Sequence, residues 1–250
     1  MDNAEQPDDT PVETIEGDEV TVFVNGLFNP KDEATWTANK AKLLDIFGCP
    51  AVHIHNPTLA RDIPHERVTS LVRKNAGLAF GAALMAAAAV AVDSYLDTGY
   101  RERVIATSMD GIRSQLEPQA VTVADKMKRH MKSMCEANPN IKTINLVCHS
   151  HGGWCTLCFI REGHAEALAQ DHGIKFHVFV LGSPVLVHPG PGAEDILQLH
   201  NALDPVSLRY EDPNEILESD FVRAQADRPY HSCLTYMDWL KVERNAPDAI

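Results

Sequence analysis

The sequence predicts an α/β domain in which a mostly parallel sheet is covered by helices on both faces. Two observations support this prediction: short β-branched and aromatic runs alternate with longer helical patterns, and no proline- or glycine-rich linker divides the ordered part. Such alternation favours parallel strands, because each crossover lays a helix against the sheet. With 250 residues, of which 44% are hydrophobic and 23% charged, the chain can form one large core. We therefore expect a single domain over residues 19–250.

The chain begins with an acidic segment that has little to bury. The net charge is −13 at pH 7, and residues 1–19 hold eight acids and no base. This composition predicts a disordered tail over residues 1–18. The segment lacks the features of a secretory signal and the six cysteines do not form a disulfide framework, so we expect a cytoplasmic protein, with signal-independent export left open. An acidic body without a basic stripe argues against nucleic acid as a partner.

The first strand is predicted at residues 19–24, a β-branched and aromatic run that ends at Asn25-Gly26. A helix should follow, because residues 29–32 (Asn-Pro-Lys-Asp) combine a capping residue, a proline at the first helical position and an acid in the first turn. This helix is expected to end at Gly48. The remaining predicted elements are a strand at 51–55, a helical region at 64–138 that includes an insertion around 64–110, strands at 143–148, 175–181 and 195–200, and helices from about Gly152 and over 233–242.

Residues 148–153, Cys-His-Ser-His-Gly-Gly, lie at a predicted strand-to-helix junction and carry the strongest chemical signal. A serine hydroxyl is a weak nucleophile and must be held where a base can reach it. A tight strand-to-helix turn does this and needs small neighbours, here Gly152 and, where the G-x-S-x-G pattern has its first glycine, Cys148. We therefore predict Ser150 as a nucleophile; the alternative is an ordinary turn that contains a serine. The amide of His151, at the helix N-terminus, is expected to donate to a developing oxyanion.

A serine nucleophile needs a histidine base and a carboxylate that orients it, in the chain order serine, acid, histidine. Asp204 follows the strand predicted at 195–200, so it lies at the sheet edge where α/β proteins place their sites. His231 directly precedes the last predicted helix. We assign His231 as general acid and base and Asp204 as its orienting partner. The alternatives are a turn-forming Asp204 with Asp195 as the reserve acid, and a helix-terminal His231 with His188 or His200 as the base.

These motifs resemble those of α/β-hydrolases of the lipase/esterase kind. Besides residues 149–153, residues 180–184 (Val-Leu-Gly-Ser-Pro) resemble the Gly-Ser-Pro that follows the next strand in many lipases, including the class 3 type, and residues 201–206 resemble the segment that carries their acid. The resemblance implies an α/β-hydrolase fold, an ester or acyl-lipid substrate, a Ser-His-Asp triad and no cofactor. It also implies a second oxyanion donor in the loop after the first strand, Asn25-Gly26-Leu27, where we select the Leu27 amide.

The predicted function is therefore that of a serine hydrolase of carboxylic esters that acts through an acyl-enzyme. The same residues serve thioester hydrolysis and acyl transfer, which the sequence does not separate. A different class is a non-catalytic protein that binds a membrane or a partner on a hydrolase scaffold. Its contact would be residues 76–92, seventeen uncharged residues of which nine are alanine. This run fits a packed internal helix, a lid in peripheral contact with lipid, or a membrane span.

The histidine and cysteine pairs do not predict a metal or redox site. His53-x-His55 and His149-x-His151 lack a cysteine or acidic partner at ligand spacing. Cys155-x-x-Cys158 falls inside the helix predicted after the serine, without the context of a redox motif. We expect no metal at either histidine pair and a packing role for the cysteines.

Overall fold

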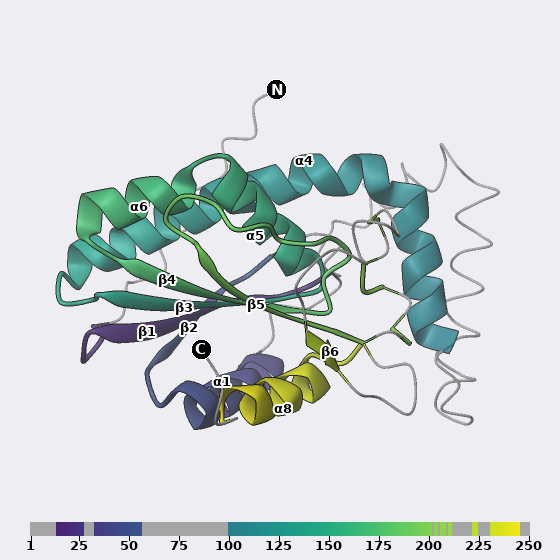
Figure 1. Cartoon of the computed structure of the whole chain (residues 1–250), viewed down its shortest axis with the longest axis horizontal. Coiled ribbons are helices and arrows are strands. Elements are labelled where there is room, and N and C mark those ends of the chain that lie inside the picture. Colours follow the sequence, from purple (N-terminus) through teal and green to yellow (C-terminus); the bar gives the residue numbers. More distant parts are fainter. Residues whose placement is uncertain are drawn as a thin grey trace.

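The structure of the chain is a computed structural model. A parallel sheet lies at the centre of the fold (Figure 1). Within the described residues the sheet has six strands in the order β2–β1–β3–β4–β5–β6, and every neighbouring pair is parallel, which confirms the α/β class. The strands are β1 (Glu19–Val24), β2 (Ala51–Ile54), β3 (Thr143–His149), β4 (Lys175–Leu181), β5 (Asp195–Asn201) and β6 (Val222–Ala224). The structure describes residues 14–27, 33–56, 100–201, 203–204, 206–208, 210–211, 222–224 and 231–245.

Helices cover both faces of the sheet (Figure 1). One face carries α4 (Tyr100–Ala137), α5 (His151–Arg161) and α6 (His164–His172), and the other carries α1 (Glu33–Phe47) and α8 (Cys233–Arg244). The alternation of side chains in β1 serves both layers: Val20, Val22 and Val24 join the core under α4 and α5, whereas Phe23 joins the core under α1 and α8. Two apolar layers therefore hold the sheet between them, as a buried parallel sheet requires.

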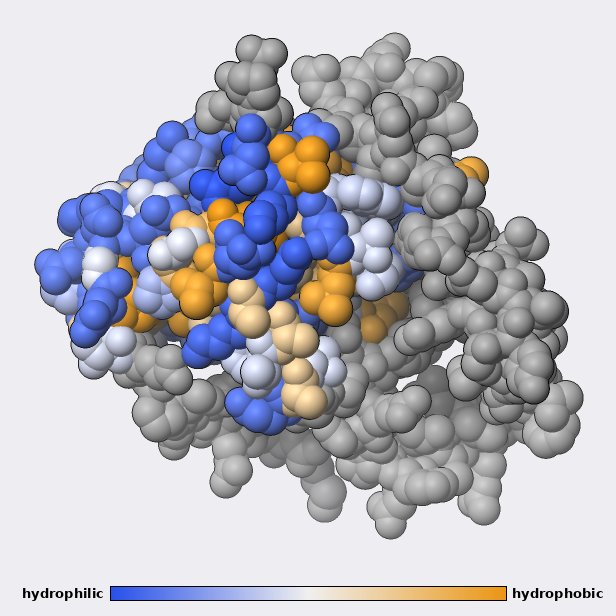
Figure 2. Space-filling view, turned by 90° about the horizontal axis from the view of Figure 1, so that it is seen from below, coloured by the Kyte–Doolittle hydropathy of each residue, from blue (hydrophilic) through white to orange (hydrophobic). Residues whose placement is uncertain are grey.

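The outer surface of the α1–α8 layer is mainly hydrophilic, with apolar side chains between the polar ones (Figure 2). Lys42 pairs with Asp238 across the two helices, and Lys241 Nζ lies 2.8 Å from Asp45 Oδ2. Exposed ion pairs of this kind stabilise a protein only weakly. The apolar inner faces of the two helices, rather than these pairs, therefore keep α8 against the sheet.

The strand order creates a topological switch point between β1 and β3. β1 pairs with β2 on one side and with β3 on the other, so the connections after β1 and β3 leave in opposite directions. In parallel α/β sheets the carboxyl ends of the strands at such a point form a crevice for ligands. Asn25, which follows β1, and Ser150, which follows β3, lie at this edge.

Two glycines at the start of α5 let the helix approach the strand ends. A Cβ atom on Gly152 would lie 2.4 Å from the carbonyl oxygen of Val24, and one on Gly153 would lie 2.5 Å from the side chain of Ser183. Real Cβ atoms do not come this close to a main chain or a buried side chain. Gly152 and Gly153 are therefore required by the packing of α5 against β1 and β4, as the sequence motif predicts for small residues beside the serine.

The helices and strands agree with the predictions except in three places. The nine-residue α6 and the three-residue β6 are not predicted, because short elements carry little periodic signal. Within residues 14–18 one residue departs from the predicted solvated tail: Ile15 is buried and its amide donates to Asn138 Oδ1 at 2.8 Å, whereas the other four residues are exposed. The main chain of this segment is also held at Asp18, whose carbonyl accepts from the Lys142 and Thr143 amides. The predicted segments that lie outside the described residues are 1–13, the capping sequence 29–32, and 64–99, which includes 76–92.

None of the described helices is both long and apolar enough to span a bilayer. The longest, α4, includes Pro118, which lacks the N–H that a helix interior uses. Figure 1 shows α4 bent along its length, as expected for a helix with an internal proline. The N-terminal part of α4 therefore lies away from the sheet, and the rest of the helix packs along it.

Candidate active site

Ser150 occupies a strained turn between β3 and α5. Its backbone has φ 55° and ψ −126°, which is unusual for a residue with a side chain. Its amide donates to the carbonyl oxygen of Leu181 at 2.9 Å, and a Cβ atom on Gly26 would lie 2.7 Å from Ser150 Cβ. β4 and the loop after β1 thus hold the turn from both sides. Backbone strain that the surroundings maintain in this way is typical of functional sites.

The structure brings together the three predicted side chains, Ser150, His231 and Asp204. Ser150 Oγ donates to His231 Nε2 at 2.8 Å, and His231 Nδ1 donates to Asp204 Oδ2 at 2.7 Å. The donor directions follow because an ionised carboxylate only accepts, so the imidazole proton lies on Nδ1 and Nε2 is the acceptor. The serine hydroxyl therefore faces a base whose tautomer is set by the carboxylate.

Asp204 is held by two groups besides His231. Oδ1 accepts from the Val206 amide at 2.9 Å, and Oδ2 accepts from the Tyr236 hydroxyl at 2.8 Å. The Tyr236 oxygen in turn accepts from the Asn201 amide at 3.1 Å. Burial raises the pKa of Tyr236 well above its usual value, and the nearby Asp204 charge adds to the effect, so the phenol stays protonated and remains a donor. The carboxylate is thus held by its own loop and by α8, and the Tyr236 hydroxyl is held in turn by the end of β5.

Sequence reasoning missed Tyr236. A tyrosine on the buried face of a terminal helix indicates core packing, and nothing in the local pattern relates it to an acid 32 residues earlier. The sequence feature that is related to Tyr236 is the glycine of Gly-Ser-Pro. Gly182 has φ +55°, and a Cβ atom there would lie 2.6 Å from the Tyr236 ring. Gly182 therefore leaves room for the ring that holds Asp204.

The two segments predicted to supply oxyanion donors lie beside Ser150. His151 is the first residue of α5, and the first amides of a helix have no partner inside the helix. The loop after β1 reaches Ser150 through Gly26, and Leu27, the next residue, is buried. The side chain of His151 is also buried, and burial lowers its pKa to about 4. A neutral imidazole therefore lies directly next to the turn.

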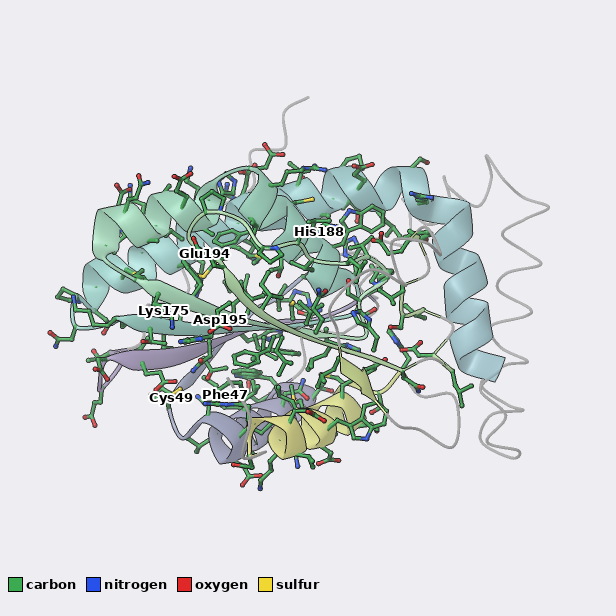
Figure 3. The ribbon with its side chains drawn as sticks, viewed as in Figure 1. Phe47, Cys49, Lys175, His188, Glu194 and Asp195 are labelled. Atoms are coloured by element: carbon green, nitrogen blue, oxygen red, sulfur yellow. The ribbon has the colours of Figure 1, made fainter. Side chains whose placement is uncertain are left out.

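The reserve residues lie elsewhere. Asp195 begins β5 and pairs with His177, at the end of the sheet where Figure 3 shows it beside Lys175. His200 is buried on β5, where its Nδ1 lies 2.7 Å from Ser207 Oγ. His188 is exposed on the connection after β4. The described contacts of the Ser150 hydroxyl include none of these three reserve residues, and they do include His231.

The thiols near the serine are buried in the core. Cys148 lies inside β3, and burial raises its pKa to about 12, so the thiolate is disfavoured. Cys155 is buried on α5, and burial raises its pKa well above the usual value. In the part of the chain that the structure describes, no three histidine, cysteine or acidic side chains are grouped as metal ligands.

The buried histidines predict loss of stability in acid. Burial lowers the pKa of His151 and His200 from 6.5 to about 4. The unfolded chain therefore binds more protons than the folded one below about pH 6.5, and stability falls as the pH is lowered. We expect a loss of about 3 kcal/mol per histidine between neutral pH and about pH 4. Urea unfolding at several pH values over this range measures the loss. His200→Gln should make the free energy of unfolding depend less steeply on pH. A pH dependence equal to that of His188→Gln, a control at an exposed site, would contradict the prediction.

No protein-family model matches the chain, and no curated protein matches it. The class of the protein is therefore defined by its fold and its site. It is an α/β protein in which a serine, a histidine and an aspartate form one hydrogen-bonded chain at the carboxyl edge of a parallel sheet.

Proposed function

We propose that the protein is a serine hydrolase of carboxylic esters with an α/β-hydrolase fold of the lipase/esterase type. The observation that carries the proposal is the continuous hydrogen-bonded chain from Ser150 Oγ through His231 to Asp204, with the serine on a strained turn. The chain order serine, aspartate, histidine is that of α/β-hydrolases. The switch-point position of Ser150 and the close approach of Gly152 to β1 support the same fold.

In the proposed reaction Ser150 Oγ attacks the carbonyl carbon of the ester while His231 Nε2 takes the hydroxyl proton. Asp204 stabilises the imidazolium that forms, and the amides of Leu27 and His151 donate to the oxyanion. Collapse of the tetrahedral intermediate breaks the bond to the leaving alcohol, which receives the proton from His231. Water then attacks the acyl-serine, gives its proton to His231, and the acid is released as Ser150 regains a proton.

The proposed substrate is an ester with an apolar acyl part, such as an acyl lipid. Apart from the sequence resemblance, support comes from two exposed leucines close in sequence to the site. Leu203 precedes Asp204 and is 50% exposed, and Leu234, in the first turn of α8, is 44% exposed. Exposed apolar side chains in the segments that carry Asp204 and His231 favour a substrate with both apolar and polar parts.

The proposal is tested by the reaction of the intact protein with a fluorophosphonate probe, with the labelled residue located by peptide mass spectrometry. We expect one adduct, on Ser150. Hydrolysis of p-nitrophenyl esters from acetyl to palmitoyl then gives the chain-length preference, and a thioester or an added alcohol acceptor tests the related reactions. A protein that is not labelled at Ser150, and that binds liposomes only when residues 76–92 are intact, would instead be a binding protein on this scaffold.

A further inference from the structure

Asn56, which follows β2, forms a reciprocal pair with Asn25, which follows β1. The Asn56 amide donates to Asn25 Oδ1 at 2.8 Å, and Asn25 Nδ2 donates to the Asn56 carbonyl at 3.1 Å. Asn56 Nδ2 also donates to the Asn25 carbonyl at 3.2 Å. Both residues are buried, Asn56 completely. The two strand ends are therefore joined by three hydrogen bonds in a place from which water is excluded, where such bonds are strong and costly to break.

The same Asn56 side chain reaches α5. Its Nδ2 lies 3.0 Å from His151 Nδ1, and on the other side of the ring His151 Nε2 lies 3.2 Å from the carbonyl oxygen of Leu116 on α4. A carbonyl only accepts, so Nε2 carries the proton and Nδ1 accepts from Asn56. This arrangement needs a neutral imidazole, in agreement with the low pKa that burial gives His151.

One amide side chain thus joins the two segments that would supply the oxyanion donors. Asn25 immediately precedes Gly26 and Leu27, and His151 supplies the other amide. The proposed reaction needs both amides to converge on one oxygen, and an error of about 1 Å in such placement costs roughly 100-fold in rate. A buried leucine would fill similar space without polar atoms that need partners. Packing alone therefore does not explain why position 56 holds a polar residue.

We propose that Asn56 is a positioning residue that holds the loop after β1 and the start of α5 in the relative position required for oxyanion binding. The inference rests on the proposed hydrolase function. Asn56 is fully buried and acts through Asn25 and His151, not by touching the substrate. Its removal affects the step in which negative charge develops on the carbonyl oxygen more than it affects substrate binding.

The test is Asn56→Leu, assayed with a p-nitrophenyl ester. We expect kcat per fluorophosphonate-titrated site to fall roughly 10- to 100-fold while KM changes less than about threefold. Affinity for a trifluoromethyl ketone, which forms a tetrahedral adduct with the serine, should weaken by the same factor as kcat. The matched control is Asn138→Leu: Asn138 is a buried asparagine that binds the Ile15 amide and the Met134 carbonyl, away from the site. It should lower stability and leave kcat per titrated site unchanged.

A second variant keeps the test decisive if Asn56→Leu does not fold. His151→Leu breaks the same hydrogen bond from α5 and leaves the Asn25–Asn56 pair intact, and it should reproduce the loss of kcat and of ketone affinity. If the wild type is labelled and active but both variants retain wild-type kcat and ketone affinity, the positioning role is wrong and the proposed function stands. If the wild type is neither labelled nor active, the proposed function itself fails.

Discussion

Ser150→Ala is expected to lower ester turnover by roughly 10⁶-fold, to the level that binding and oxyanion stabilisation alone provide. The Ser150 hydroxyl lies 2.8 Å from His231 Nε2, so alanine removes the nucleophile and leaves the base without a proton to take. The turn itself is held by main-chain contacts from Leu181 and by Gly26, which do not involve Oγ–H donation. Stability should therefore change little, and circular dichroism and thermal unfolding test this alongside the rate.

The matched control for this prediction is Cys148→Ala. Cys148 is the other potential nucleophile in the motif, but it lies within β3 with its Sγ 3.5 Å from the Phe179 carbonyl. We expect the variant to keep its turnover per labelled site, although it loses some core volume. Retained activity in Ser150→Ala together with loss in Cys148→Ala would exchange the two roles and overturn the assignment of Ser150.

Asp204→Asn should lower kcat by roughly 10⁴-fold near neutral pH, through the tautomer of His231. Oδ2 of Asp204 accepts from both His231 Nδ1 and the Tyr236 hydroxyl. An amide placed there with its NH₂ toward His231 favours the tautomer with the proton on Nε2, which cannot accept from Ser150. In the opposite orientation of the asparagine side chain that this substitution introduces, the NH₂ group faces the Val206 main-chain amide, which is also a donor. Either orientation loses a hydrogen bond, so we also expect a moderate fall in stability.

Asp195→Asn is the control for this second prediction. Asp195 is also paired with a histidine, His177, but at the opposite end of the sheet. Its replacement should leave kcat within about twofold of the wild type, as is usual for substitutions away from the reaction centre. Comparison of kcat for the two variants therefore separates a role in the site from the general effect of losing a carboxylate–histidine pair. Equal kcat values for both variants would argue against Asp204 as the orienting acid.

The elements with a strong pattern are predictable from the sequence. β1, β3, β4 and β5 are short apolar runs, rich in β-branched or aromatic residues in β1, β3 and β4, and their predicted limits differ from the observed ones by at most one residue. Short elements such as β6 carry too few residues for a pattern. Ile15 shows the opposite case, since an acidic composition does not reveal that one apolar side chain in the run is buried.

The residues of the candidate site likewise fall into those that the sequence predicts and those that it does not. Ser150, Asp204 and His231 are recognisable because each lies close in sequence to the end of a strong element, and because the chain order of the three residue types is restrictive. Tyr236 and Asn56 are not recognisable, because their roles come from partners 32 and 95 residues away, Asp204 and His151. The local sequence around a single tyrosine or asparagine does not indicate which distant residue it contacts.

The sequence by itself therefore determined the α/β class, the edge of the sheet on which the site lies, and the three residue types that meet there. These follow from periodicity and from small residues at a turn, which are local properties. Tertiary structure alone decided which groups fix Asp204, which histidines are kept neutral by burial, and how the ends of β1, β2 and β3 are joined through Asn25, Asn56 and His151. The physical reason is that hydrogen-bond geometry and burial depend on distances between segments that are remote in the chain, and these distances exist only after the sheet has formed.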